Sequence, residues 1–278
     1  MPEVWSIAIY RGTSPLTLAP SGVVITGRDV TDVDAASVAD PFLIRRDGRW
    51  FLFFEVIPRH NHRGGVIAFA ESDDAVRWRY GGVILREPFH LSYPHVFEWD
   101  GETYMTPENA HGVRLYRCSE FPRVWRYAGD LLSIEGADPT LFWFEGRWFL
   151  FVYTGPDTLR LFFSDELTGR YREHPSSPIV ADDTCARPAG RIIIHDGVPL
   201  RFAQVGRPSY GTAVRAFRIT ELTPTSYREE EAATAPILTA SGAGWNANGM
   251  HHIDAHQLED GTWIGAVDGR GSLIDGVE

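Results

Sequence analysis

Carboxylic acids and other polar side chains recur at two positions of a repeated sequence pattern, and these residues are the ones best suited to chemistry. One set stands at the start of five segments: Asp40, Tyr93, Asp138, Arg187 and Asp254. A second set follows, fifteen residues later in three segments and at similar spacing in two: Glu55, Glu108, Tyr153, Gln204 and Asp268. Carboxylic acids that lie close together cannot all ionise freely, so one becomes a neutral acid while another stays a base. Glycosyl chemistry requires this pairing of acid and base.

The segments that carry these residues each contain two β-rich, aromatic runs joined by an acidic residue and a glycine. Such pairs favour tight β-hairpins, because glycine adopts the positive φ that the turn requires. After most hairpins come a third alternating run and a short closing run, so each unit is expected to have four strands. The hairpin pairs are Asp47-Gly48, Asp100-Gly101, Glu145-Gly146, Asp196-Gly197 and Asp260-Gly261.

The fifth hairpin has no third and fourth strand after it, and residues 4–25 match the missing pair. We therefore expect an all-β fold: a single domain over residues 1–278, a five-bladed β-propeller closed by N-terminal strands that complete the last blade. A β-sandwich with coincidental hairpins is the alternative. The longest candidate helix, residues 223–234, carries three consecutive glutamates and is interpreted as a solvated turn.

In a propeller, the start of each first strand and the end of each second strand share one face near the axis. A packed axis would place small or apolar residues there, yet all ten positions are polar or tyrosine. This pattern favours a functional centre. The alternative is that the side chains hydrogen-bond neighbouring blades, and we expect about half of the ten to do so.

Histidines gather beside the same positions. His90 lies close to Tyr93, and His252 and His256 flank Asp254 on one face of a strand. Imidazole and carboxylate together suit a divalent ion such as calcium, with His252 and His256 as ligands, whereas a water-filled axial channel is the alternative. In the glycine-rich stretch before them, Trp245 is the candidate for stacking on a sugar.

Composition excludes several classes of function. The chain has 37 acidic and 26 basic residues, a formal net charge of −11, which disfavours nucleic acid as a partner. All the basic residues are arginine, so a Walker phosphate loop and pyridoxal chemistry are excluded. Two cysteines suit neither a disulfide framework nor a zinc site. No membrane span or export signal is recognisable, which predicts a cytoplasmic protein.

Several sequence words carry a resemblance to known families. The tripeptide Ala-Asp-Pro at the start of the first and third repeats resembles the clan of family 43 and family 62 glycoside hydrolases. More closely, nearly the whole chain resembles the N-terminal domain of plant glucosamine inositolphosphorylceramide transferases and its stand-alone bacterial relatives. The matching words are VTDV at Val30, VADPF at Val38, FFEV at Phe53, EPFHLSYPHVFEW at Glu87, ARPAGR at Ala186 and GWNANGMHHIDAHQ at Gly244.

The hydrolase resemblance implies that Asp40 is a general base and Asp138 an orienting aspartate. Its fourth-blade acid is not matched, because Arg187 stands there, so an acid must come from Glu108 or Glu55. Arginines at this place suit a phosphate, which their guanidinium groups bind with two parallel hydrogen bonds. Besides Arg187, the residues expected to contact substrate are His90, Tyr93, Arg191, Gln204, Trp245, His252, Asp254 and Asp268.

The sequence thus predicts a carbohydrate-active enzyme that transfers a glycosyl group from a phosphate-bearing sugar donor to an acceptor. A glycoside hydrolase of furanosidase or arabinanase type is one alternative. A non-catalytic glycan-binding propeller is the other, and the plant transferases, which carry a separate catalytic domain, make it a real rival. No cofactor other than the axial ion is expected.

Overall fold

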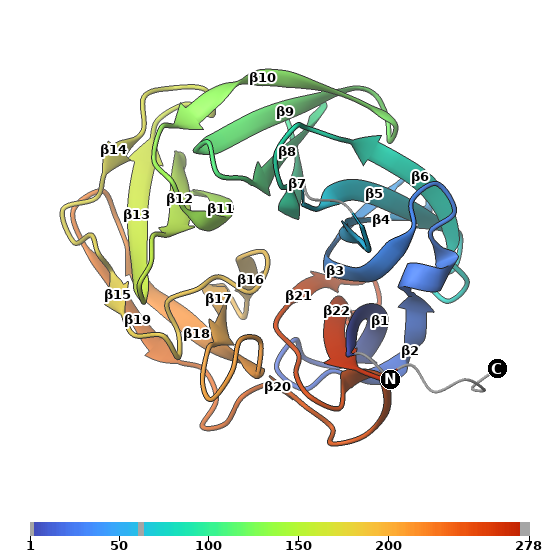
Figure 1. The fold of residues 1–278 in the computed structure, drawn as a ribbon. Coiled ribbons are helices and arrows are strands. Elements are labelled where there is room, and N and C mark those ends of the chain that lie inside the picture. The colour runs from blue at the N-terminus through green and yellow to red at the C-terminus, as the bar shows by residue number, and fades with distance from the viewer. Residues whose placement is uncertain (1–2, 61–63, 273–278) are drawn as a thin grey trace.

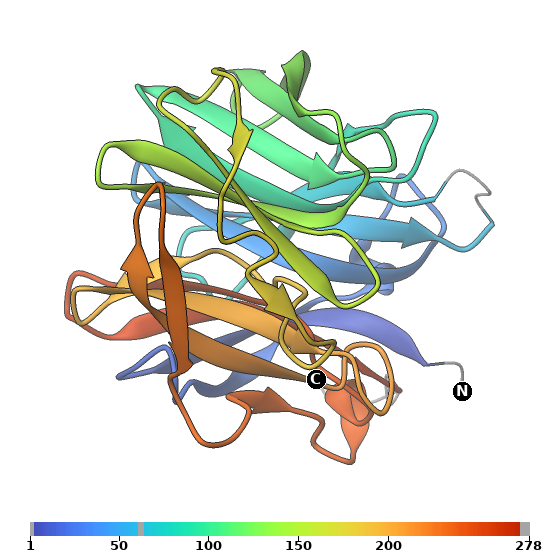
Figure 2. The same cartoon turned by 90° about the vertical axis from the view of Figure 1, so that its left-hand side faces the viewer.

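Five antiparallel sheets stand around a common axis in the computed structural model of this chain, which describes residues 3–60 and 64–272 (Figure 1). Seen at right angles, the sheets nearest the viewer are twisted (Figure 2). The prediction of an all-β five-bladed propeller is confirmed. Helical structure in the described residues is limited to the short 3₁₀ turns η1 (Gly27–Asp29) and η2 (Gly244–Asn246), and no described helix has the length and apolarity needed to cross a membrane.

The blades follow one another along the chain and are numbered I to V in the order of their inner strands. Blade I comprises β3 (Ala35–Arg46), β4 (Arg49–Pro58), β5 (Val66–Ser72) and β6 (Arg79–Leu85). Blade II comprises β7 (Ser92–Trp99), β8 (Glu102–Glu108), β9 (Val113–Glu120) and β10 (Val124–Leu132). Blade III comprises β11 (Ala137–Phe144), β12 (Arg147–Tyr153), β13 (Thr158–Ser164), β14 (Arg172–Glu173) and β15 (Val180–Ala181).

Blades IV and V complete the ring. Blade IV comprises β16 (Ile193–His195), β17 (Val198–Val205), β18 (Ala213–Leu222), β19 (Tyr227–Glu231) and β20 (Leu238–Thr239). Blade V combines β21 (Ile253–Gln257) and β22 (Trp263–Gly271) from the end of the chain with β1 (Val4–Gly12) and β2 (Ala19–Ile25) from its start.

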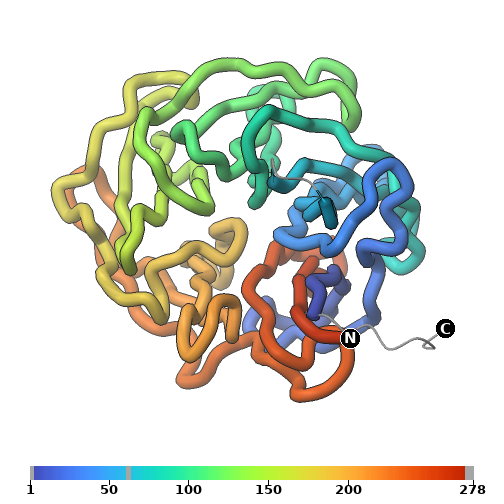
Figure 3. The backbone as a smooth tube through the Cα atoms, viewed as in Figure 1, coloured from blue at the N-terminus to red at the C-terminus, as the bar shows by residue number. Residues whose placement is uncertain are grey.

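Ring closure by the N-terminal strands is therefore confirmed. Strand β1 pairs with β22 over its whole length, from Val4 opposite Gly271 to Gly12 opposite Trp263. In Figure 3 the blue tube of β1 runs beside the red tube of β22. Ile7 and Ile9 are buried in the core between blades V and I, and Ala8 in the core between blades IV and V. The strands from the start of the chain thus contribute to the cores on both sides of blade V.

Four of the predicted hairpins turn in the expected way. In each the acidic residue and the glycine both have positive φ, as at Asp47 (51°) and Gly48 (76°), which gives the strands the right-handed twist of a blade. The turn at Gly261 differs, since there only the glycine has positive φ and its N–H donates to the carbonyl of Leu258.

Residues 223–234 were expected to form a solvated turn, and this prediction is wrong. Tyr227–Glu231 is strand β19, paired with β18. Glu229 accepts hydrogen bonds from the buried Arg201 at 2.6 and 2.8 Å, so the glutamate run supplies a buried ion pair. The alternation of exposed and half-buried side chains in this run is that of an outer strand.

A bulge at the start of the inner strands positions the polar residues of the axis. In blades I, II and III the strand register breaks at a residue followed by proline, and that residue has positive φ: Asp40 (53°), Tyr93 (44°) and Asp138 (49°). This conformation costs about 1–3 kcal/mol for a residue other than glycine and persists only where the surroundings hold it. Such residues cluster at functional sites.

We predict that deleting residues 1–25 abolishes cooperative folding, because it opens two cores and leaves the edge of β22 unpaired. The matched control is a circular permutant that begins within residues 30–34 and joins residue 272 to residue 3 by a short linker, since Val4 and Gly271 are paired. Thermal unfolding followed by circular dichroism should show a single transition for the permutant alone. A deletion variant that melts cooperatively would contradict closure.

Candidate active site at the propeller axis

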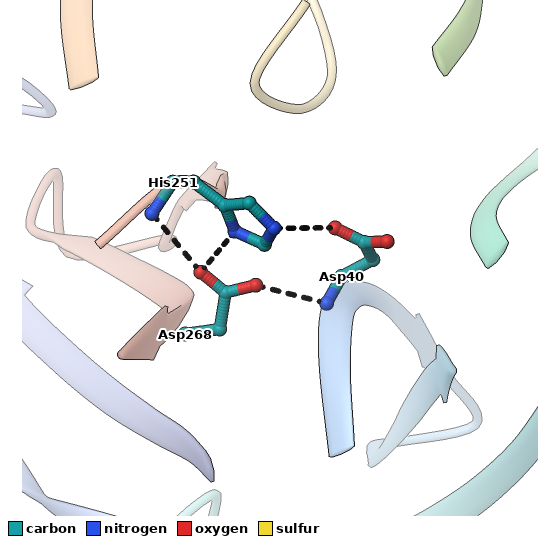
Figure 4. Close-up of side chains that lie close together, drawn as sticks. All are labelled: Asp40, His251 and Asp268. Atoms are coloured by element: carbon teal, nitrogen blue, oxygen red, sulfur yellow. Dashed lines mark hydrogen bonds and ion pairs between the residues drawn. The ribbon is translucent and has the colours of Figure 1, made fainter. Parts of the chain in front are cut away.

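The buried carboxyl of Asp40 faces blade V at the centre of the ring (Figure 4). Its Oδ1 lies 3.8 Å from Nε2 of His251, whose Nδ1 is 2.8 Å from Oδ1 of Asp268. Asp268 also accepts the backbone N–H of Asp40 at 3.0 Å through Oδ2. Asp40 itself accepts the N–H of Tyr93 at 3.2 Å. The predicted base is thus held by bonds from two neighbouring blades.

Arg187 joins the opposite side of the same cluster. Its Nε donates to Asp138 Oδ2 at 2.5 Å, and its Nη2 lies 3.3 Å from Glu108 Oε2. Gln204 donates a further hydrogen bond to Asp138 at 2.9 Å. The Nη1 group of Arg187 bonds to none of the described residues, and a quarter of the side chain is exposed. Arg187 therefore retains donors for a ligand.

Glu55 completes the group of acids. It is buried, and its Oε1 lies 3.6 Å from Nε2 of His90. Because Nδ1 of His90 accepts the N–H of Gly65, the neutral ring carries its proton on Nε2, facing Glu55. A Cβ atom at Gly65 would overlap with Oε1 of Glu55 and with the carbonyl oxygen of Leu91. Glycine is therefore required for this close approach.

The acids differ in the direction of their pKa shifts. Burial raises the pKa of Asp40 to about 7, partly opposed by His251. Burial and the neighbouring charge of Asp40 raise the pKa of Glu55 well above its ordinary value, and burial with the charge of Asp138 does the same for the pKa of Glu108. These three groups can therefore hold protons near neutral pH.

Asp138 and Asp268 behave in the opposite way. Burial acts against ionisation of both, but Arg187 holds the pKa of Asp138 below its usual range, and His251 does so for the pKa of Asp268. Burial likewise opposes the charge on His251, yet Asp268 and Asp40 keep the pKa of this imidazole above its ordinary value. The site thus contains two ion pairs and three acids whose pKa values are raised. Acid–base catalysis needs such a separation between groups that stay ionised and groups that hold a proton.

Aromatic side chains border this cluster, and the sequence did not point to two of them. Trp5 stacks on His251 with ring centroids 4.1 Å apart, and Tyr210 meets the same imidazole edge-on at 5.1 Å. The guanidinium of Arg187 lies 5.1 Å from the ring of Tyr210 and 5.7 Å from that of Tyr153. Tyr210 is 45% exposed, so its ring is available to a ligand. Trp5 and Tyr210 lie outside the repeated positions of the sequence. Tyr153 is one of these positions, so the sequence pointed to it alone among the three.

Tyr93 lies beneath the acids, in a buried layer. Its hydroxyl contacts the hydroxyl of Thr140 at 2.8 Å and accepts the N–H of Gly190 at 3.0 Å. His252 is fully buried beside it, with Nδ1 3.7 Å from Asp40, and burial lowers its pKa to about 4. The ring of Phe42 packs edge-on against both. These two predicted substrate contacts belong to a buried aromatic layer with Phe42, next to Asp40.

Arg191 and Asp254 are not brought to the cluster. Arg191 donates to Asp254 at 2.9 Å and to the carbonyls of Leu43 and Val96, which ties four blades together and uses its guanidinium. The register explains the error for Asp254. It lies opposite Ala266, two residues before Asp268, which is the place that Phe42 holds relative to Glu55 in blade I.

His256 and Trp245 contact residues other than the three acids Asp40, Glu55 and Glu108. His256 contacts Asp254 at 2.9 Å, and the ring of Trp245 packs directly on the backbone of β22 at Gly269. A divalent ion in the axis stays a prediction. Among the described residues, the side chains whose ligand atoms come together for an ion, within 4.8 Å of one another, are those of Asp40, His251 and Asp268, and not His252 with His256.

Comparison of the sequence with known families gives one match over nearly the whole chain. The family described as "Glucosamine inositolphosphorylceramide transferase 1, N-terminal" matches residues 2–270, so the resemblance seen in the sequence is confirmed. Glucosamine inositolphosphorylceramide transferase 1 of Oryza sativa subsp. japonica is 32% identical over 95% of this chain, and that of Arabidopsis thaliana is 33% identical over 95%. The chain spans only about 40% of the length of these relatives.

Several solved structures of carbohydrate enzymes have a similar fold. The β-1,2-mannobiose phosphorylase from Listeria innocua superposes with a TM-score of 0.67 at 13% identity, over 94% of this chain and 96% of that one. A family 117 glycoside hydrolase of Zobellia galactanivorans gives 0.61 at 12% identity, over 98% and 93%. A thermostable family-43 glycoside hydrolase gives 0.58 at 15% identity, over 86% and 91%. At these identities the likeness concerns the fold.

The opposed pKa shifts predict opposite effects of two matched substitutions. Asp40 is protonated in the folded protein and ionised in the unfolded chain between pH 4 and 7, so its contribution to stability falls as pH rises through this window. Asp40→Asn should therefore gain stability relative to the parent between pH 4 and 8, by up to about 4 kcal/mol. Urea unfolding at both pH values measures this gain.

Asp138→Asn is the control with the opposite sign. The folded pKa of Asp138 is lowered, so its stabilising contribution is present above the unfolded pKa and is lost as pH falls. This variant should lose stability at pH 8, where it leaves Arg187 without its partner, and lose less at pH 4. Parallel pH profiles for the two variants would contradict the assignment of charges.

Proposed function

Since the chain belongs to the family described as glucosamine inositolphosphorylceramide transferase 1, N-terminal, we propose that its axial cluster is the site of a carbohydrate-active enzyme that transfers a glycosyl group. We propose further that the donor carries a phosphate. The activity named for the plant relatives belongs to proteins more than twice as long, so it supports the class of substrate rather than the reaction.

One observation carries this proposal: acids from three successive blades surround one arginine that keeps free donors. Asp138 pairs with Arg187, Glu108 lies 3.3 Å from the same guanidinium, and Asp40 titrates near neutrality beside them. A purely structural ion pair needs one acid for one arginine. Additional acids with raised pKa values lower the stability of the folded protein at neutral pH. A protein retains such acids where proton transfer is useful.

In the proposed reaction Asp40, in its ionised form, accepts the proton of an acceptor hydroxyl. The acceptor oxygen then bonds to the anomeric carbon, and the bond from that carbon to the phosphate oxygen breaks with its electron pair on the phosphate. Arg187 donates hydrogen bonds to the departing anion, and protonated Glu108 donates another. A phosphate leaves as a stable anion, so it does not require a dedicated acid at the position that Arg187 occupies.

Hydrolysis is the second candidate, and the raised pKa of Glu108 favours it. A protonated Glu108 can donate its proton to a neutral leaving group, with water in place of the acceptor. The fold neighbours include glycoside hydrolases as well as a phosphorylase, so the fold is compatible with both chemistries. The two candidates differ in their need for a phosphate.

The phosphate requirement is tested by ligand-induced stabilisation. Glucosamine 1-phosphate and a nucleoside diphosphate sugar should raise the Tm of the parent, by an amount that corresponds to about 2.7 kcal/mol at a concentration of 100 Kd. Arg187→Lys keeps the charge that balances Asp138 but removes the fork, and it should lose most of this shift. The exposed Arg117→Ala is the control and should keep it. A parent that cleaves neutral aryl glycosides and ignores every phosphate would establish hydrolysis instead.

Asp40→Asn should retain the fold and lose turnover by at least about 100-fold, because it removes the proton acceptor at nearly unchanged volume. The measurement is single-turnover release of phosphate from the donor that stabilises the parent most. Tyr127→Phe, an exposed change on an outer strand, is the control. Turnover near the parental value in Asp40→Asn would favour the non-catalytic glycan-binding propeller.

A further inference from the structure

We propose that His251 is a further catalytic residue, whose Nε2 holds the acceptor hydroxyl together with Oδ1 of Asp40. This assignment rests on the proposed function, because it adds a second contact to the oxygen that attacks the sugar. Two features carry it: the way in which the imidazole is fixed, and the atom that its free nitrogen faces (Figure 4).

The imidazole of His251 is fixed on three sides. Its Nδ1 lies 2.8 Å from the buried, ionised carboxylate of Asp268, so this nitrogen carries a proton and donates a hydrogen bond. The indole of Trp5 stacks on one face of the ring at an interplanar angle of 20°, and Tyr210 meets the ring edge-on. An imidazole held through one nitrogen by a carboxylate presents its other nitrogen to a reactant. In His251 that nitrogen is Nε2.

Nε2 faces an oxygen atom that the protein leaves without a hydrogen bond. Oδ2 of Asp40 accepts the N–H of Tyr93, whereas Oδ1 accepts no hydrogen bond from the described residues. Oδ1 lies 3.8 Å from Nε2 of His251 and 3.7 Å from Nδ1 of His252, and both separations exceed the length of a hydrogen bond. One further atom between Oδ1 and Nε2 can bond to both.

A hydroxyl oxygen suits this place by its size and its chemistry. The side chains of His251 and Asp40 are only 3% and 8% exposed, so the gap admits one small group rather than a sugar ring. A hydroxyl both donates and accepts, so it can bond to the carboxylate of Asp40 and to the N–H of Nε2 at once. A phosphate oxygen accepts only, and ionised Asp40 would repel it.

His252 does not share this role, although it lies at a similar distance from Asp40. It is fully buried, and its ring packs against Phe42 and Tyr93. Neither of its ring nitrogens bonds to a described residue. No carboxylate therefore fixes its tautomer or turns one nitrogen toward the reactants.

The two contacts have different roles in the transfer step. Carboxylates lie beyond both ring nitrogens of His251, which favours the charged imidazole with a proton on Nε2. The acceptor hydroxyl then donates its proton to ionised Asp40, while its oxygen accepts a hydrogen bond from Nε2. As this oxygen bonds to the anomeric carbon, the proton passes to Asp40 and the imidazole keeps its own. Nε2 thus orients the attacking oxygen without exchanging a proton.

The test compares two substitutions that each keep one half of the imidazole. His251→Asn places an amide where Nδ1 lies and keeps a donor for Asp268, but it removes the group that faces Asp40. His251→Gln places its amide where Nε2 lies. The measurement is single-turnover release of phosphate from glucosamine 1-phosphate by the intact chain, with water as the acceptor and EDTA present. His251→Asn should lose turnover by about 100-fold, and His251→Gln should retain at least about 10 times more than His251→Asn.

Two controls separate this role from a structural one. Both variants should keep the Tm shift that glucosamine 1-phosphate produces, because Arg187 is unchanged. His174→Asn changes a buried imidazole outside the cluster, which contacts the carbonyl of Thr223 and accepts the N–H of Ser176, and it should keep the parental turnover.

Parental turnover in His251→Asn, or equal losses in the two variants, would overturn the inference and leave the proposed function standing. Parental turnover that EDTA abolishes and calcium chloride restores would assign the imidazole to an ion and overturn it as well. A parent that turns over no phosphate-bearing donor contradicts the inference and the proposed function together.

Should His251→Asn fail to fold, a crystal of the intact parent soaked in glycerol decides. We expect a glycerol oxygen within hydrogen-bonding distance of both Nε2 of His251 and Oδ1 of Asp40. Glycerol bound elsewhere, with no oxygen between these two atoms, would contradict the assignment.

Discussion

The carboxylate of Asp268 is the interaction on which both the ring and its polar centre depend. It is fully buried in the last blade and accepts four hydrogen bonds: two from the backbone of His251 and His252, one from the imidazole of His251 and one from the backbone of Asp40. A buried carboxylate without such donors would cost several kcal/mol. The bond to Asp40 crosses 228 positions of the sequence, so closing the propeller and building the site are one event.

The same arrangement recurs around the axis. The three bulge residues of the inner strands each donate their backbone N–H to a carboxylate of the preceding blade: Asp40 to Asp268, Tyr93 to Asp40, and Asp138 to Glu108. Backbone strain at the inner strands is thus offset by bonds between blades. About half of the ten axial residues were expected to serve such bonds, and these contacts explain why polar side chains occupy positions that packing alone would fill with apolar ones.

The architecture was predictable because acidic-glycine turns, strand alternation and the unmatched first strands are local signals. The axis was less so. In three repeats a proline marks the bulge, after Asp40, Tyr93 and Asp138, and a proline also follows Arg187. The last repeat has no proline at this place, and spacing alone misplaced Asp254 by two residues. The partner of a side chain is a property of the fold, so nothing in the sequence distinguished Arg191, which ties blades, from Arg187, which keeps free donors. Trp5 and Tyr210 lie on no repeated position.

The account holds that a phosphate-bearing sugar occupies the space between Arg187 and Asp40. A crystal structure of the intact chain soaked with glucosamine 1-phosphate tests this most directly. We predict phosphate oxygens within hydrogen-bonding distance of the Arg187 guanidinium, the anomeric carbon facing Asp40, and the sugar ring against Tyr210. Density for the ligand on another face of the propeller, with the axial cluster unchanged, would contradict the claim that these residues form the site of glycosyl transfer.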